Sequence, residues 1–314
     1  MKHENKIKKM MFIFLWNKNL NISSFLSCIS CVSWLKKGII LLFLGSTLLC
    51  SAAENKRLIR IVSLSPNITE AIFALDLGKC LVGRSNVCNY PEAAKKIPIA
   101  GRFAQPNIER VIALRPDYII SSALQDQAMI KRFKQFGIKV LFLPNKSFAD
   151  YFNTLKILGK ILNCPKKAEL ICRQDKAELE KLKQAANKIP ESKKTKVLFV
   201  IQDTPLITIG RNSFITNMIH LAGGVSVTSE RPKAYFYCPL EWLLTHQPDV
   251  LILPAMQETR AKGLVKRSGW NNLEAVKNGR LFYKMNPDLI SRMGPRSIEG
   301  IKLMRKIFKS VITK

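Results

Sequence analysis

The sequence predicts an α/β fold in which two lobes with mainly parallel sheets are joined by one long rigid helix. Three observations lead to this prediction. Short apolar runs alternate with helical segments in both halves of the chain. The stretch Pro165–Lys188, which separates the halves, has strong helix-forming composition throughout. A unit made of a helix, a Pro-Asp turn and an apolar run occurs once in each half.

The connecting helix is predicted from composition and apolar spacing. After Pro165, which suits a first helical position, the stretch has no Gly or further Pro and is dense in Ala, Leu, Glu, Lys and Gln. Lys183 and Lys188 lie near its end, where the helix dipole favours cations. One apolar stripe is expected from Ile171, Leu179, Leu182, Ala186 and Ile189. At a rise of about 1.5 Å per residue the helix would be roughly 36 Å long and would act as a strut.

The first half alternates strands and helices. Its expected strands are 58–64, 81–83, 118–122 and 139–143. Its expected helices are 68–77, 108–114, 129–136 and 148–162, and 99–101 is expected to lead into a loop at 102–107. Strands that alternate with helices imply right-handed crossovers and a mainly parallel, Rossmann-like sheet.

The second half repeats the pattern. Strands are expected at 196–201, 250–253 and 280–283, and helices at 213–221, 240–245, 273–277 and about 297–310. The resulting domain prediction is a leader at 1–53, an N-terminal lobe at 54–163, the connecting helix at 164–190 and a C-terminal lobe at 191–314.

An internal repeat supports two related lobes. Residues 107–123 and 239–255 align at an offset of 132, with five identities in 17 positions that include a Glu, a Pro and an Asp. Short units of helix, turn and strand resemble one another in many proteins, so the identities alone leave chance open. Their equivalent placement on either side of the connecting helix favours duplication.

Composition limits the class of partner. The chain of 314 residues has 51 Lys and Arg against 22 Asp and Glu, which gives a formal net charge of +29. Such a charge would fit a nucleic acid or an anionic surface. The lysines, however, are spread along the chain without a run of five and without interleaved aromatics. Solvated faces are therefore the favoured interpretation, and no nucleic-acid partner is predicted.

The amino terminus has the features of a leader. In 36–53 a basic pair precedes a short apolar core and small residues, which is the pattern of a secretory signal with cleavage after Ala53. This predicts an exported, periplasmic protein. Cys50 raises a lipid-anchored form as the second choice, because the residues before it fit a lipidation site poorly. The leader's length would also be explained by a start codon assigned too early.

Cysteines and histidines give little support for a metal site or for catalysis. The five cysteines that follow the leader are Cys80, Cys88, Cys164, Cys172 and Cys238. The sequence leaves their pairing open, and the odd count leaves at least one of them free. None of them forms a CxxC pair, and only His220 and His246 accompany them. GxSxG, HExxH, GxGxxG and P-loop motifs are absent. No metal and no enzyme activity are predicted. An exported α/β hydrolase and a structural or adhesive surface protein remain as alternatives.

A cleft between the lobes is the expected ligand site, because open parallel sheets bind ligands at the carboxyl ends of their strands. Loops leaving those ends in the first half carry Ser65, Asn67, Asn86, Tyr90, Phe103, Gln105 and Ser122. Those in the second half carry Gln202, Asp203, Arg211, Tyr235, Phe236, Tyr237, Met256, Asp288 and Arg292. This mixture of aromatic and polar groups suits a large, partly flat ligand. Glu109 and Glu241 form a duplicated pair at corresponding helix starts, where two carboxylates could bind a partner that carries arginines.

Several ordered motifs resemble one known family. They are RIVSLSPNITEAIFAL, LVGRSNVCNYPEAAKKIP, NIERVIALRPDYII, LEWLLTHQPDVLIL and SRMGPRSIEGIKLM. Together with the connecting helix they make residues from about 57 to 308 similar to the periplasmic substrate-binding proteins of ABC importers for vitamin B12, ferric siderophores and haem. The resemblance implies two lobes around a ligand, little hinge motion, no cofactor, and partnership with a membrane permease and its ATPase. It also implies that Glu109 and Glu241 dock on arginines of the permease.

Within that family the chain looks closest to the vitamin B12 (cobalamin) binders. Tyr90 matches a ligand-contacting Tyr, Phe103 and Tyr235 fall near Trp positions, and Asp288 and Arg292 match polar cleft residues. Ser122 replaces a cleft aromatic, and Leu289 stands at another Trp position, so aromatic stacking on a corrinoid would be weaker. The ligand could therefore also be a corrinoid analogue, haem or a ferric siderophore. The expected ligand contacts are Tyr90, Phe103, Ser122, Tyr235, Phe236, Asp288 and Arg292.

Overall fold

The computed structural model describes residues 57–254 and 256–312. The described residues from Leu58 onward form one structural unit. The predicted leader, its signal segment at 36–53 and the candidate lipidation site Cys50 lie outside the described residues, as does Ala255 at the end of the internal repeat.

The first lobe is built on a six-stranded sheet with the order β4-β3-β2-β1-β5-β6. All neighbours pair in parallel except β3 and β4. The strands are β1 (Ile61–Ser63), β2 (Leu81–Ser85), β3 (Ile99–Arg102), β4 (Gln105–Pro106), β5 (Tyr118–Ser121) and β6 (Lys139–Phe142). The helices are α3 (Pro66–Ala74), η3 (Gly78–Cys80), η4 (Glu92–Lys96), α4 (Ile108–Ala113), α5 (Gln127–Gln135) and α6 (Phe148–Ile161).

Polar residues at the helix starts explain where several of these helices begin. The side chains of Asn107, Asp126 and Ser147 accept backbone N–H groups in the first turns of α4, α5 and α6. The loop expected at 102–107 is wrong in part, because β3 continues through Arg102 and turns into the short strand β4. Two strand residues that close a hairpin are too few to give a periodic sequence signal.

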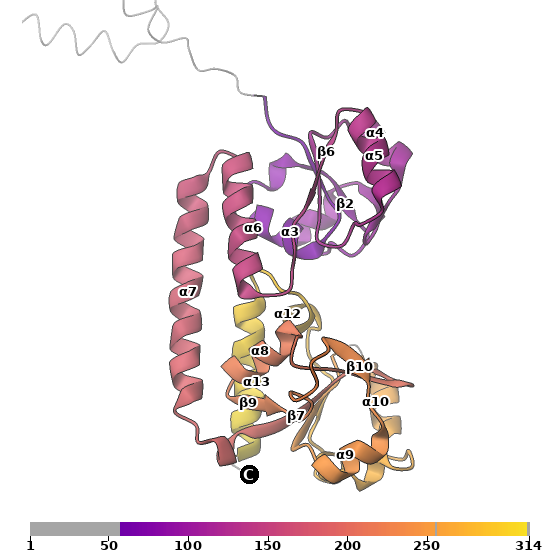
Figure 1. The fold of residues 1–314 in the computed structure, drawn as a ribbon, viewed down its shortest axis with the longest axis vertical. Coiled ribbons are helices and arrows are strands. Elements are labelled where there is room, and N and C mark those ends of the chain that lie inside the picture. Colours follow the sequence, from indigo (N-terminus) through magenta and orange to yellow (C-terminus); the bar gives the residue numbers. More distant parts are fainter. Residues whose placement is uncertain (1–56, 255, 313–314) are drawn as a thin grey trace, which may run out of the picture. The chain divides into compact units, whose positions relative to one another are not determined.

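Helix α7 (Pro165–Asn187) confirms the long helix predicted between the two halves, and Lys188 is its C-cap. In Figure 1 it runs beside α6 and reaches the second half of the chain, where it contacts α8 and α13. Ala168 and Cys172 pack into a hydrophobic cluster of the first lobe, and Leu182 packs into one of the second. One helix thus contributes to the cores of both lobes.

The second lobe has a sheet with the order β10-β8-β7-β11-β12, and β9 also pairs with β7. Its strands are β7 (Thr195–Asp203), β8 (Leu206–Ile209), β9 (Gly224–Ser226), β10 (Tyr235–Tyr237), β11 (Val250–Ile252) and β12 (Leu281–Phe282). Its helices are η5 (Glu191–Lys193), α8 (Phe214–Leu221), α9 (Leu240–His246), α10 (Glu258–Leu264), η6 (Trp270–Asn272), α11 (Glu274–Lys277), α12 (Asp288–Ser291) and α13 (Ser297–Ile312). The predicted strands of this half are confirmed in place, but the sequence pattern did not indicate β8, β9 and β10. Strand β8 pairs antiparallel with both β7 and β10, so this sheet is mixed.

Side chains from each lobe enter the core of the other. Phe148, Leu179 and Phe214 pack against one main cluster of the first lobe and also against one of the second. Met293 follows α12 in the second half of the chain, yet it is buried in the first lobe's cluster. The lobes therefore share apolar contacts in addition to the covalent link through α7.

The five cysteines of the described chain are free thiols, and all but Cys164 are buried. Burial raises the pKa of the Cys238 thiol to about 11, which keeps it protonated and unreactive at neutral pH.

Gly300 marks a close contact between α13 and α12. A Cβ atom on Gly300 would overlap the backbone oxygen of Leu289, which cannot move aside as a flexible side chain could. We expect Gly300→Ala to lower the free energy of unfolding by about 2–3 kcal/mol. The melting temperature measured by circular dichroism should fall by roughly 5–10 °C.

Gly263 in α10 is the matched control, because a Cβ atom added there would meet no heavy atom within 4 Å. Gly263→Ala should raise the stability by up to about 1 kcal/mol, since alanine is the better helix former. Equal melting temperatures for the two variants would contradict the packing argument.

Candidate functional site

A cleft lined by both lobes has a volume of about 1110 Å³. Its first-lobe wall contains Phe103, Phe142 and the loop between β6 and α6. Its second-lobe wall contains Tyr235 and the start of α8. Phe103, Phe142 and Tyr235 are 46%, 47% and 47% exposed, so nearly half of the surface of each residue remains open to a ligand.

Local structure explains how these aromatic residues reach the cleft. Phe103 occupies the turn between β3 and β4, and Phe142 is the last residue of β6. Tyr235 opens β10, which pairs antiparallel with β8 at the position Tyr235 to Ile209. Phe214 begins α8 directly after Ser213, whose hydroxyl accepts the backbone N–H of Ile215. Turns and strand ends therefore supply the aromatic faces.

The polar lining of the cleft is mostly basic and neutral. Lys146 comes from the first lobe and Lys233 from the second, and Asn145 and Asn212 add amide groups. The one acidic residue of the lining, Asp150, uses its carboxylate to accept the backbone N–H of Lys146 at 2.9 Å. The Oδ1 atom of Asn145 is buried without a hydrogen-bond partner within the described structure. Such a cleft can hold a flat apolar body and form hydrogen bonds with polar or anionic groups at its edges.

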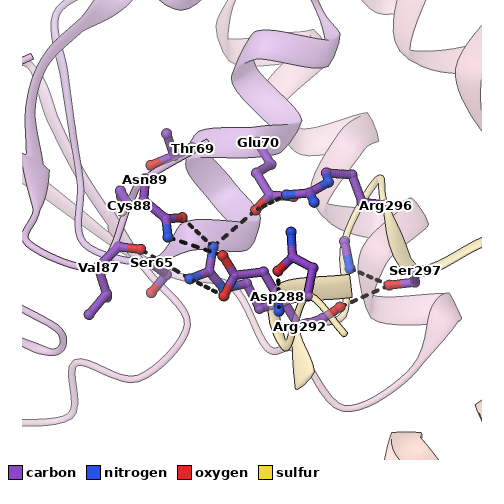
Figure 2. Close-up of polar contacts among 12 residues, drawn as sticks. Ser65, Thr69, Glu70, Val87, Cys88, Asn89, Asp288, Arg292, Arg296 and Ser297 are labelled. Carbon is purple, nitrogen blue, oxygen red and sulfur yellow. Dashed lines mark hydrogen bonds and ion pairs between the residues drawn. The ribbon is translucent and has the colours of Figure 1, made fainter. Parts of the chain in front are cut away.

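A second set of polar residues joins the lobes through Arg292 (Figure 2). The guanidinium of Arg292 donates to Oδ1 of Asn89 at 2.8 Å and to the backbone oxygen of Val87 at 3.3 Å. It also forms ion pairs with Glu70 at 3.3 Å and Asp288 at 2.7 Å. We call Glu70, Val87, Asn89, Asp288 and Arg292 the Arg292 network.

Burial controls the ionisation of Glu70 in this network. Desolvation raises the pKa of Glu70 to about 6, against the opposing charges of Arg296 and Arg292, while the charge of Asp288 raises it further. Because this pKa lies above the ordinary value of 4.5, the stabilising effect of protonating Glu70 is complete below pH 4.5 and is lost as the pH rises through 6. Glu70 is therefore mostly ionised at neutral pH, and the charges of Arg292 and Arg296 stabilise its buried carboxylate.

The seven expected ligand contacts fall into separate places. Phe103, Ser122 and Tyr235 line the cleft. Asp288 and Arg292 belong to the Arg292 network, and the guanidinium of Arg296 covers the ring of Tyr90 at 3.8 Å. Phe236 packs against a hydrophobic cluster of the second lobe and lines a different pocket beside α9.

The other residues that line the cleft were not expected from the sequence, among them Phe142, Asn145, Lys146, Asn212, Phe214 and Lys233. Phe142 could have been found, because it lies at the carboxyl end of a predicted strand, where ligands of parallel sheets bind. Lys146 and Lys233 gave no such signal, since lysines occur throughout this chain.

The comparisons with known proteins decide the family. A family model described as periplasmic binding protein matches residues 61–287. The chain belongs to the periplasmic binding protein family. An uncharacterized ABC transporter substrate-binding lipoprotein of Bacillus subtilis (strain 168) is 30% identical over 77% of this chain and 77% of its own length. A vitamin B12-binding protein of Vibrio vulnificus (strain YJ016) is 27% identical over 80% of this chain and 90% of its own.

Solved structures resemble this periplasmic binding protein over most of its length. A periplasmic haem-binding protein from Roseiflexus sp. RS-1 has a TM-score of 0.72 at 25% identity, covering 81% of this chain and 99% of the other. A periplasmic haem-binding protein from Pseudomonas aeruginosa has a TM-score of 0.70 at 26% identity, covering 79% of this chain and 92% of the other. The family is one of transport substrate-binding proteins, which work with membrane permease and ATPase components, and the relatives named above are periplasmic proteins or lipoproteins.

Glu109 and Glu241 lie at corresponding places in this periplasmic binding protein. Each occupies the first turn of a short helix, α4 or α9, and each is exposed. Neither has an ion-pair partner in the described part of the chain, whereas Glu258 and Glu274 at other helix starts pair with lysines. Their carboxylates are thus open to an external cation.

No helix in the described part of the chain is both long and apolar enough to span a membrane. No three His, Cys, Asp or Glu side chains there come together in a way that could hold a metal ion.

Proposed function

We propose that this chain is the substrate-binding component of an ABC importer that captures cobalamin or another corrinoid in the cleft between its lobes. The observation that carries the proposal is the cleft itself, which has an aromatic face on each wall and a volume of about 1110 Å³. Drug-sized ligands occupy pockets of about 300–1,000 Å³, so this cleft suits a larger molecule. A corrinoid is a large macrocycle with apolar faces and amide-bearing arms.

The residues have binding roles only. Phe103 and Tyr235 would cover the faces of the macrocycle, and Asn145 and Asn212 would hydrogen-bond its amide arms. Ser122 adds a small polar group where a bulky side chain would narrow the cleft. The relative named as a vitamin B12-binding protein, 27% identical over 80% of this chain, supports this choice of ligand. Delivery would follow when exposed Glu109 and Glu241 dock on arginines of the permease.

A haem or an anionic ferric chelate is the second candidate ligand. It is favoured by Lys146 and Lys233, which place a positive charge on each wall of the cleft. The solved haem-binding proteins, at 25% and 26% identity, also support it. Carboxylate or catecholate groups at the rim of such a ligand would pair with the two ammonium groups.

Titration with candidate ligands tests the proposal. Protein lacking residues 1–53 should bind cyanocobalamin with a dissociation constant of about 1 μM or lower, which corresponds to a binding free energy of about −8 kcal/mol. Quenching of the intrinsic Trp and Tyr fluorescence measures the binding. Binding of haem or a ferric catecholate but of no corrinoid would select the second candidate. Absence of binding to any of these ligands would reject both.

A further inference from the structure

Both terminal nitrogens of the Arg292 guanidinium are engaged within the protein. Its Nη1 atom reaches Oε1 of Glu70 at 3.3 Å and Oδ1 of Asn89 at 2.8 Å. Its Nη2 atom reaches the backbone oxygen of Val87 at 3.3 Å and Oδ1 of Asp288 at 2.7 Å. Both partners of the central ion pair are largely covered, with only 16% of the Arg292 side chain and 3% of the Glu70 side chain exposed. A ligand that took over Nη1 or Nη2 of Arg292 would compete with contacts that connect the lobes.

The other contacts of the Arg292 network also connect the two lobes. We call the region where the loop 86–91 meets the segment 288–297 the junction. Asn89 donates through Nδ2 to Oδ2 of Asp288 at 3.0 Å, so its amide contacts two residues of the second lobe (Figure 2). Arg296 lies 3.9 Å from Glu70 and covers Tyr90. Met293, between the two arginines in sequence, is buried in the first lobe's hydrophobic cluster. The segment 288–297 is thus fixed to the loop 86–91 by hydrogen bonds and by the contact of Arg296 with Tyr90, and to α3 and the first lobe's core by charge and apolar packing.

Each side of the junction continues to a wall of the cleft. In the first lobe, the backbone N–H of Asn86 donates to the backbone oxygen of Gly101 at 3.0 Å, and Gly101 belongs to β3, which leads into the turn that carries Phe103. In the second lobe, α12 contacts α8, whose first residue, Phe214, lines the cleft. Contiguous contacts therefore run from Phe103 through Arg292 to Phe214.

We propose that Arg292 is a positioning residue: it fixes the loop 86–91 against the segment 288–297 and thereby sets the separation of the two cleft walls. It acts on ligand affinity through this geometry and does not contact the ligand. When the walls already have the correct separation before binding, the binding free energy does not include an entropic cost of ordering them. The inference rests on the proposed capture of a ligand in the cleft, and it assigns to Arg292 a role other than the ligand contact expected from the sequence.

Arg292→Lys is the test variant, because lysine keeps the positive charge that Glu70 needs. A single ammonium group cannot reach Glu70, Asn89, Val87 and Asp288 together, since it lacks the planar fork of a guanidinium. We expect the ligand affinity to fall by about tenfold, within the usual range of couplings between sites, and most of the loss to appear as faster dissociation. Hydrogen exchange of the amides in 86–91 and 101–106 should become faster, while exchange in α7 stays unchanged.

Arg260→Lys is the matched control. Arg260 pairs with Asp203 at 2.6 Å entirely within the second lobe, so this change should alter neither affinity nor exchange at the junction. A second variant, Glu70→Gln, removes the buried carboxylate but keeps an acceptor for Arg292, and its effect on dissociation should be smaller than that of Arg292→Lys.

The outcomes separate this inference from the proposed function. If the unmodified protein binds none of the ligands, the proposed function fails, and hydrogen exchange still tests the junction. If it binds ligand and Arg292→Lys changes neither dissociation nor exchange in 86–91, the positioning role is rejected while the function stands. Uniformly faster exchange across the whole protein would show a purely structural role and would also overturn the inference.

Discussion

Replacing Glu109 and Glu241 together by alanine is expected to abolish stimulation of the permease ATPase by the ligand-loaded protein. The two carboxylates are exposed at the first turns of α4 and α9 and have no ion-pair partner among the described residues. An arginine on a partner can therefore pair with each of them without first displacing a lysine. Ligand affinity should be unchanged, because neither residue lines the cleft. ATP hydrolysis by the permease complex in lipid vesicles measures the effect.

Glu299 supplies the control for this experiment. It is also an exposed acid in the first turn of a helix, α13, but it has no counterpart in the internal repeat. Glu299→Ala should leave stimulation within about twofold of normal, since a surface charge outside an interface contributes little. Full stimulation by the double variant would exclude the docking role, and loss of ligand binding would reassign the two acids to the ligand site.

Replacing Phe103 and Tyr235 together by alanine should weaken ligand binding by more than about 100-fold, because each ring that covers an apolar ligand face contributes about 2 kcal/mol, the threshold of a binding hot spot. The two residues face the cleft from opposite lobes and are each nearly half exposed, so truncation costs little folding stability. The two losses of binding free energy should add, because the rings come from separate elements. Isothermal titration calorimetry with the ligand identified by fluorescence quenching measures the change.

Phe136 provides the aromatic control. It is 55% exposed as the C-cap of α5 and does not line the cleft, so Phe136→Ala should bind normally. A loss of less than about fivefold in the double variant, far below the effect of one hot-spot ring, would place the ligand elsewhere than between these rings.

The parts of the fold that were predictable are those with a long or repeated signal. Helix α7 has many consecutive residues of strong helix propensity, and the parallel strands β1, β5, β7 and β11 are apolar runs bounded by turns. The strands β8, β9 and β10 are short and are set by pairing with β7 or with each other. Pairing partners outside the local segment override local preference, so sequence patterns could not locate these strands.

Phe103, Ser122 and Tyr235 of the expected contacts line the cleft, because strand ends and turns can be ordered from the sequence, whereas side-chain direction cannot. Tyr235 and Phe236 are neighbours on β10, yet only Tyr235 lines the cleft, since successive residues of a strand point to opposite faces. A shift of one residue in the assigned strand reverses this assignment.

The roles of Asp288 and Arg292 depend on contacts that are distant in the chain. Their charges suggested a ligand, but Asn89 lies 199 positions from Asp288 and Glu70 lies 222 positions from Arg292. No local pattern indicates that a carboxylate so far away in sequence already satisfies the guanidinium. A charged cleft residue and a charged residue of the junction therefore look alike until the tertiary structure is known.

The shared hydrophobic contacts limit how such a protein can be divided. Phe148, Leu179 and Phe214 complete clusters on both sides, and Met293 fills the core of the lobe to which its own segment does not belong. A fragment that ended after α6 would expose apolar surface that is normally covered. If the first lobe were exchanged between relatives, the segment 288–297 would therefore have to be exchanged with it. Recombination in this family is expected to keep that segment together with the first lobe.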